Sequence, residues 1–152
     1  MIKKVKTKKI DVAKKGKTGW QYSEAVKNHF FHPKNVLLKD PKPGEYDAEA
    51  VIGAPVCGDV MRMWVKIDKK TEKIKKLKWR TFGCATAIAS TSVFSEMITE
   101  NGGLKIEEAL KIKPDDIVKK LGGVPDRKIH CSVLADQAFK EAIKNYKEKH
   151  GK

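Results

Sequence analysis

Residues 60–99 decide the fold, and they read VMRMWVKIDKKTEKIKKLKWRTFGCATAIASTSVFSEMIT. Apolar and polar residues alternate over Val60–Asp68, which predicts a strand with one buried face. The expected buried residues of that strand are Met61, Met63, Val65 and Ile67. We expect a turn over Lys69–Thr71 and a second strand over Lys73–Phe82. After Cys84 the apolar spacing changes to the period of a helix.

The second of these strands has an irregular start. Leu77 and Trp79 share one face of the strand, and Ile74 is out of phase with them. We therefore expect a bulge or a frayed end at Ile74. A short apolar segment, Ala48–Val56, predicts one more strand earlier in the chain. Consecutive strands that are joined by short turns favour an antiparallel meander.

Helical segments are predicted on both sides of the strands. Val26 and Phe30 follow Tyr22 at intervals of four residues, so Tyr22–Phe31 is expected to form a helix. The helix after Cys84 is expected to stop at Asn101-Gly102-Gly103. The later expected helices are Lys105–Lys111, a segment from Pro114 to Gly122-Gly123, and Ser132–Lys149. This order of elements predicts an α+β fold, a three-stranded antiparallel β-sheet with helices packed on one face.

The chain has 152 residues and a formal net charge of +14, which is unevenly distributed. Residues 1–19 contain eight lysines, one acidic residue and no aromatic residue. We therefore expect a flexible lysine-rich N-terminal arm over residues 1–19 and a single folded domain over residues 20–152. The chain has no apolar run that could span a membrane and no apolar segment behind its basic start. These features predict a cytoplasmic protein.

The three cysteines lie at the ends of predicted elements, where side chains reach a rim rather than the core. Cys57 closes the first strand, Cys84 precedes the long helix and Cys131 starts the last helix. Asp59 and His130 lie next to them in the sequence. Three thiolates with a carboxylate or an imidazole suit zinc or the iron of an iron–sulfur cluster, rather than calcium or magnesium. Because no CxxC pair occurs, spacing alone leaves both a shared metal site and separate buried thiols open.

Three motifs surround these cysteines. They are Gly53-Ala54-Pro55-Val56-Cys57-Gly58-Asp59-Val60-Met61, then Thr81-Phe82-Gly83-Cys84 with Ala87-Ile88-Ala89-Ser90, then Lys128-Ile129-His130-Cys131-Ser132-Val133-Leu134. Together they resemble the three signatures of the IscU/NifU-type iron–sulfur cluster assembly scaffolds. The segment from Tyr22-Ser23-Glu24 to His32-Pro33-Lys34-Asn35 is similar to the opening of the same domain. The resemblance covers about residues 20–149, in the same order and at similar spacing.

The resemblance implies a non-enzymatic scaffold. In this family a cysteine desulfurase delivers sulfur, an iron donor adds iron, and the cluster passes to apo iron–sulfur recipient proteins. The resemblance implies that Cys57, Cys84 and Cys131 are ligands, that Cys131 also accepts the persulfide, and that Asp59 or His130 is the fourth ligand. This ligand set is compatible with one [2Fe–2S] cluster per chain or a [4Fe–4S] cluster shared by a homodimer. Zinc in the cluster-free form is also compatible with it.

The chain departs from the family pattern in three places. Ala85-Thr86 follow Cys84 where the family usually has Gly-Ser, and Ala85 adopts a positive φ less readily than glycine. The segment Val124-Pro125-Asp126-Arg127-Lys128 differs from the family's Leu-Pro-Pro-Val-Lys, a chaperone recognition segment. This difference argues against a dedicated release chaperone. The lysine-rich arm has no counterpart in the short family members.

Two alternatives remain open. The first is a zinc-binding persulfide acceptor like the SufU-type sulfur transferases, which tend to lack the histidine found here as His130. The second is a nucleic-acid-binding module, which the net charge suggests but which no recognised reading element supports. His29 and His32 are expected on a helix surface. Trp64 and Trp79, on neighbouring strands, are expected to form a cross-strand packing pair.

Overall fold

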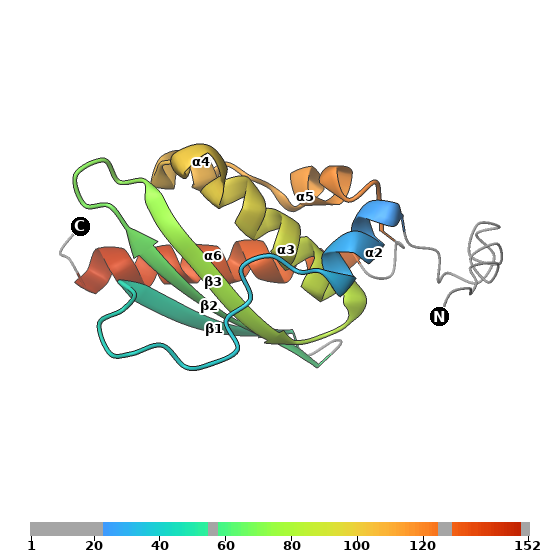
Figure 1. The fold of residues 1–152 in the computed structure, drawn as a ribbon, viewed down its shortest axis with the longest axis horizontal. Helices are drawn as coiled ribbons and strands as arrows, with labels where there is room; N and C mark the ends of the chain where they lie inside the picture. Colours follow the sequence, from blue (N-terminus) through green and yellow to red (C-terminus); the bar gives the residue numbers. More distant parts are fainter. Residues whose placement is uncertain (1–22, 55–57, 125–128, 150–152) are drawn as a thin grey trace.

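The structure is a computed structural model that describes residues 23–54, 58–124 and 129–149. Strands β1 (Ala48–Ala54), β2 (Asp59–Ile67) and β3 (Ile74–Phe82) form one antiparallel sheet in the order β1-β2-β3. Helices α3 (Ala85–Thr99) and α6 (Ile129–Lys149) lie together on one face of this sheet (Figure 1). The predicted α+β fold, with helices on one face of a three-stranded antiparallel sheet, is confirmed.

The alternation of β2 places its apolar side chains under the helices. Met61, Met63 and Val65 have no exposed surface. At the far end of the hairpin Lys66 pairs with Lys76 and Ile67 pairs with Ile74, which leaves Lys75 as the extra residue of a β-bulge. The bulge expected near Ile74 is thus confirmed, and it brings that out-of-phase side chain into the core, where it is fully buried.

The other helices of the fold are short. Helix α2 (Glu24–Phe31) begins after Ser23, whose Oγ accepts the backbone N–H of Val26 at 3.1 Å. A 3-10 turn, η1 (Glu100–Gly102), ends α3 at the predicted stop. The remaining helices are α4 (Ile106–Leu110) and α5 (Pro114–Lys120). Pro114 takes the first helical position of α5, as the sequence predicts.

Helix α6 begins three residues earlier than predicted, at Ile129 rather than at Ser132. The apolar spacing that predicts this helix begins at Leu134, and Leu134, Ala135 and Ala138 are buried. Because α6 begins at Ile129, the backbones of His130 and Cys131 lie in the first turn of α6 rather than ahead of it.

The prediction that His29 lies on a helix surface was wrong. Its Nδ1 lies 2.7 Å from Oγ of Ser92 in α3, and its Nε2 lies 3.7 Å from Oε1 of Glu96. Burial lowers the pKa of His29 below its ordinary value, although the nearby Glu96 carboxylate acts in the opposite direction. His32 is exposed, as predicted. The buried residues of α2 are therefore Val26 and His29. The predicted stripe had Phe30 in place of His29.

The predicted pairing of Trp64 with Trp79 was also wrong. Trp79 lies opposite Met63 on the helix-covered face, and Trp64 lies opposite Lys78 on the other face. The indole of Trp79 donates to the carbonyl of Lys34 at 2.8 Å. Residues 35–37 run beside β3, where the Leu37 N–H donates to Trp79 O at 2.9 Å and the Trp79 N–H donates to Asn35 O at 3.1 Å.

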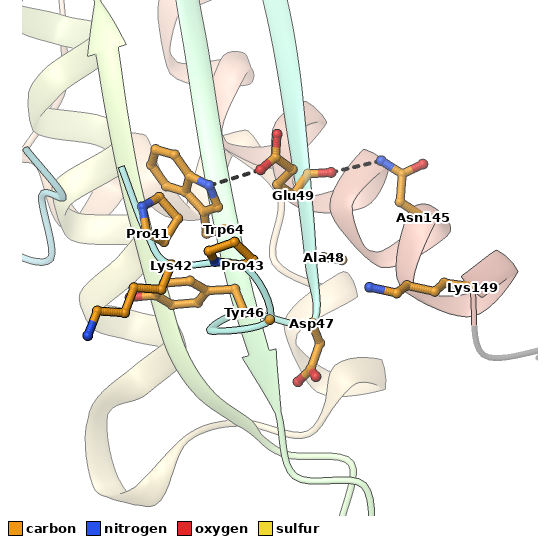
Figure 2. Close-up of a pocket in the computed structure, with 11 residues that line it drawn as sticks. Pro41, Lys42, Pro43, Tyr46, Asp47, Ala48, Glu49, Trp64, Asn145 and Lys149 are labelled. Atoms are coloured by element: carbon orange, nitrogen blue, oxygen red, sulfur yellow. Dashed lines mark hydrogen bonds between the residues drawn. The ribbon is translucent and has the colours of Figure 1, made fainter. Parts of the chain in front are cut away.

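A pocket of about 340 Å³ lies where the loop before β1, the start of β1 and the end of α6 meet (Figure 2). Two hydrogen bonds organise its wall: Trp64 Nε1 donates to Glu49 Oε1 at 3.1 Å, and Asn145 Nδ2 donates to Glu49 O at 2.9 Å. Asp59 and Cys84, the two candidate ligands whose side chains the structure describes, do not line this pocket. Within the described ranges, no helix is long and apolar enough to cross a bilayer.

Candidate metal-binding site

The centre of the candidate site is the contact between Asp59 and Cys84. Asp59 is the first residue of β2 and is only 5% exposed. Cys84 is the N-cap of α3, and its side chain makes no capping hydrogen bond there. The backbone N–H of Cys84 donates to Asp59 Oδ2 at 3.5 Å. Antiparallel pairing produces this contact, because β2 starts at the end of the sheet where β3 finishes.

Gly83 makes the contact possible. A Cβ built on Gly83 would lie 3.2 Å from Asp59 Oδ2 and 3.0 Å from the Cβ of Ala87. Both distances are shorter than an ordinary van der Waals contact, so any side chain here would push the carboxylate or the helix away. On the other side of Asp59, Gly58 has a φ of +74°, a left-handed conformation that favours glycine. Gly58 of the first motif is therefore favoured by its backbone conformation, and Gly83 of the second by close packing.

Cys57 lies outside the described residues, and so do the side chains of His130 and Cys131. The structure does describe parts of the chain next to them in the sequence. Gly58, which follows Cys57, adjoins Asp59 at the start of β2. Figure 1 shows α6 beginning at the end of the molecule where α3 also begins. The structure thus brings Asp59 to Cys84, while the shared five-residue ligand set stays a prediction.

The described pair has an electrostatic character suited to a cation site. The first backbone N–H groups of a helix have no partner within the helix and carry a partial positive charge. At α3 this charge faces the Asp59 carboxylate and the free, half-exposed thiol of Cys84. Carboxylate and thiolate groups are donors that zinc and iron take in proteins. In the described part of the chain, no three His, Cys, Asp or Glu side chains are grouped to hold a metal ion.

An exposed apolar patch adjoins the pair on the uncovered face of the sheet. Val60 follows Asp59 and lies opposite Phe82, which precedes Gly83. On β1, Gly53 lies opposite Val60, and Val51 lies two residues along the same face, opposite Arg62. Phe82 is 80% exposed, Val51 57% and Val60 39%. The sequence analysis did not identify this patch, although strand alternation carried the signal: these apolar residues occupy the face opposite to the core.

The chain matches the family model described as "NifU-like N terminal domain" over residues 21–152. It is 44% identical over 131 residues to an iron-sulfur cluster assembly scaffold protein IscU from Archaeoglobus fulgidus, covering 86% of this chain and 80% of that protein. It is 41% identical over 130 residues to the nitrogen fixation protein NifU from Nostoc sp.. That alignment covers 84% of this chain but only 42% of the Nostoc protein, which is therefore much longer.

A solved structure is similar in fold. The N-terminal part of a nitrogen-fixing NifU-like protein from Brucella abortus superposes with a TM-score of 0.66 and 18% sequence identity. The superposition covers 83% of this chain and 94% of that chain. At this identity the likeness supports the fold alone.

Proposed function

The chain belongs to the NifU-like N-terminal domain family, and on this premise we propose that it is a scaffold on which iron–sulfur clusters are assembled and then transferred to apo-proteins. The observation that carries the proposal is the Asp59 carboxylate against the N-cap residue Cys84, at the start of α3. Iron and sulfide are the cargo of this site. The protein's role is to hold them and release them, without turnover of its own.

We propose that the ligands are Cys57, Cys84 and Cys131, with Asp59 or His130 as the fourth. Three thiolates hold iron firmly, while a carboxylate or an imidazole forms a weaker and more exchangeable bond. Imidazole also takes up a proton near neutral pH, so ligation through His130 would depend on pH. A set with one exchangeable ligand suits a protein that must give up its cluster.

We propose that sulfur arrives from a cysteine desulfurase by exchange at Cys131. The Cys131 thiolate attacks the outer sulfur of the enzyme's persulfide, a new S–S bond forms, and the desulfurase thiolate leaves with the electron pair of the broken bond. This exchange needs no outside oxidant or reductant. Conversion of the transferred sulfur to sulfide then requires electrons from a reductant such as a reduced ferredoxin.

The apolar patch of Val51, Val60 and Phe82 supports docking of the desulfurase at this end of the sheet. Exposed apolar side chains that are grouped together mark protein–protein contacts more often than those scattered singly. Val60 and Phe82 directly precede or follow residues of the Asp59–Cys84 contact. A partner seated on this patch would therefore lie beside the thiols that it must reach.

Anaerobic reconstitution tests the proposal. The purified chain would be incubated with ferrous iron, cysteine, a cysteine desulfurase and a reductant such as reduced ferredoxin, and the visible absorption recorded. A scaffold gains cluster absorption, and the loaded protein then activates an apo-ferredoxin. The alternative, a zinc-binding persulfide acceptor, uses the same residues but gains only a sulfur atom, which mass spectrometry detects. Persulfide without cluster under these conditions would overturn the scaffold proposal in favour of the acceptor.

A further inference from the structure

The most cationic part of the described chain is the end of the β2–β3 hairpin, far from Cys84. Between Lys66 and Lys78 the sequence has seven lysines and two acidic residues. Four of these lysines line one hollow of about 480 Å³, together with Asp47, Ile67 and Asp68. The four are Lys66, Lys69, Lys70 and Lys75. We call this feature the lysine hollow.

The β-bulge and the strand pairing place several of these lysines close together. The β-bulge makes Lys75 an extra residue between Ile74 and Lys76, so that it joins Lys66 at the wall of the hollow. Lys66 and Lys76 also lie directly opposite each other on neighbouring strands, an arrangement in which like charges destabilise a sheet. A bound anion would offset the repulsion between these two ammonium groups.

The two carboxylates of the hollow are already engaged by the backbone. Asp47 Oδ2 accepts the N–H of Ile67 at 2.7 Å, and Asp68 Oδ1 accepts the N–H of Lys70 at 2.9 Å. No ion pair between these carboxylates and the four lysines is found among the described residues. Lys75 interacts electrostatically with Asp68, so the two carboxylates offset part of the lysine charge, and a net positive charge remains for an incoming anion.

We propose that the lysine hollow binds a carboxylate-rich segment of an acidic protein partner. The hollow lies at the start of β3, while Cys84 follows the end of that strand. A strand of this length spans roughly 30 Å, so a partner bound here leaves the candidate metal site open. This inference does not depend on the chemistry of that site.

The neighbouring side chains favour a protein over a nucleic acid. Trp64, which lies two residues before Lys66 on this sheet face, is only 1% exposed, and the guanidinium groups of Arg62 and Arg80 lie 5.1 and 5.2 Å from its ring. Phe82, the exposed aromatic residue of the same face, lies at the opposite end of β3. The ring of Trp64 is thus closed to a stacking base.

The same surface does not suit a membrane. The large apolar side chains that are exposed in the described residues all lie outside the hairpin end. They are Phe31, Leu38, Val51, Val60 and Phe82. Peripheral proteins commonly combine a basic patch with apolar side chains that enter the lipid boundary, and this hairpin end has only the first of these.

Binding of a short fluorescein-labelled polyglutamate peptide, followed by fluorescence anisotropy, tests the proposal. The variant is Lys69→Gln/Lys75→Gln, and the matched control is Lys119→Gln/Lys120→Gln, which removes the same charge from exposed positions of α5. We expect the hairpin variant to bind the peptide about three- to tenfold more weakly than the unsubstituted chain. The control should stay within about twofold, and added salt should weaken all binding.

Two outcomes would overturn the proposal. Equal loss of peptide affinity in both variants would show that binding follows net charge rather than the lysine hollow. The second is tighter binding of a short DNA duplex, or of phosphatidylserine vesicles, than of the peptide, with the loss confined to the hairpin variant. That result would assign the hollow to a nucleic acid or to a lipid surface. Circular dichroism of both variants confirms that each remains folded.

Discussion

The carboxylate of Asp59 accepts the backbone N–H of Cys84 across 3.5 Å, so two candidate ligands from different strand ends are in contact before any metal binds. A carboxylate held in this way is prepositioned rather than free in solvent. It can either remain on the helix or move to a metal ion a short distance away. A carboxylate that can move between the Cys84 N–H and a metal ion could serve as an exchangeable ligand of that ion.

Replacement of Cys57, Cys84 or Cys131 singly by serine is expected to abolish stable cluster assembly, because each change removes one of only three soft ligands. The fold should survive, since the described core consists of apolar side chains from the sheet and from α3 and α6. Visible absorption after reconstitution and far-ultraviolet circular dichroism check the two statements. Normal cluster formation in all three variants would refute a shared site.

Persulfide transfer separates Cys131 from the other cysteines. Cys131→Ser should fail to gain sulfur from the desulfurase, whereas Cys57→Ser should retain part of the transfer. Intact-protein mass spectrometry detects the added sulfur atom directly. Equal labelling of both variants would count against Cys131 as the acceptor.

Asp59→Ala is expected to hold its cluster longer than the unsubstituted chain and to pass it more slowly to an apo-ferredoxin. The reason is that the variant lacks the exchangeable carboxylate next to Cys84. Decay of visible absorption in air measures retention, and ferredoxin activation measures transfer. Asp68→Ala, in the turn at the other end of the hairpin, removes the same charge and serves as the control. Faster decay in Asp59→Ala would make Asp59 a stabilising ligand instead.

Gly83→Ala should displace the Asp59 carboxylate, because the new methyl group would lie 3.2 Å from Oδ2 and 3.0 Å from the Cβ of Ala87. We expect a loss of about 1–3 kcal/mol in the free energy of unfolding. Cluster retention should change in the same direction as in Asp59→Ala. Gly53→Ala is the matched control, since its nearest contact, Asp59 O, is 3.8 Å away. Equal destabilisation by both substitutions would contradict the steric role of Gly83.

His29 is expected to make stability depend on pH. Because burial lowers its pKa in the folded protein, the unfolded chain binds more protons between the two pKa values. Its contribution is fully present above about pH 6.5, the usual value for histidine, and is lost as pH falls through the lower folded value. Urea unfolding of the cluster-free protein at about pH 7.5 and pH 5.5 measures this loss.

His29→Gln should be less stable than the unsubstituted chain at the higher pH and should show a flatter pH dependence. His32→Gln, at an exposed position of the same segment, should keep the original dependence. If His29→Gln retained the full pH dependence, another group would have to be its source.

The sequence predicts the sheet well because two strands are half buried and alternate cleanly. The sequence also predicts the bulge, because Ile74 is out of phase with the other apolar residues of β3. The burial of His29 is not predictable in this way, because its partner Ser92 lies 63 residues away in the chain. Alternation does place Trp64 on the face opposite to the buried Met63, so the predicted pairing of Trp64 with Trp79 overlooked a signal that the sequence carries.

For the candidate site, the family resemblance implied that Asp59 and Cys84 belong to one ligand set, and the observed strand pairing explains why they are in contact. The steric role of Gly83 depends on distances below 3.4 Å between atoms of different elements, which no sequence pattern encodes. The five-residue ligand set itself stays a prediction for the variants above to test.

Residues 35–37 have a further effect through their hydrogen bonds to Trp79. They occupy the outer main-chain groups of β3 at that residue, so another molecule cannot add a strand there. On β1, the main-chain carbonyl of Glu49 is likewise taken by Asn145 of α6. Intermolecular β-pairing, the usual route from an open sheet to aggregation, is therefore hindered at both of its borders. A chain with an exposed apolar patch gains protection against aggregation from this arrangement.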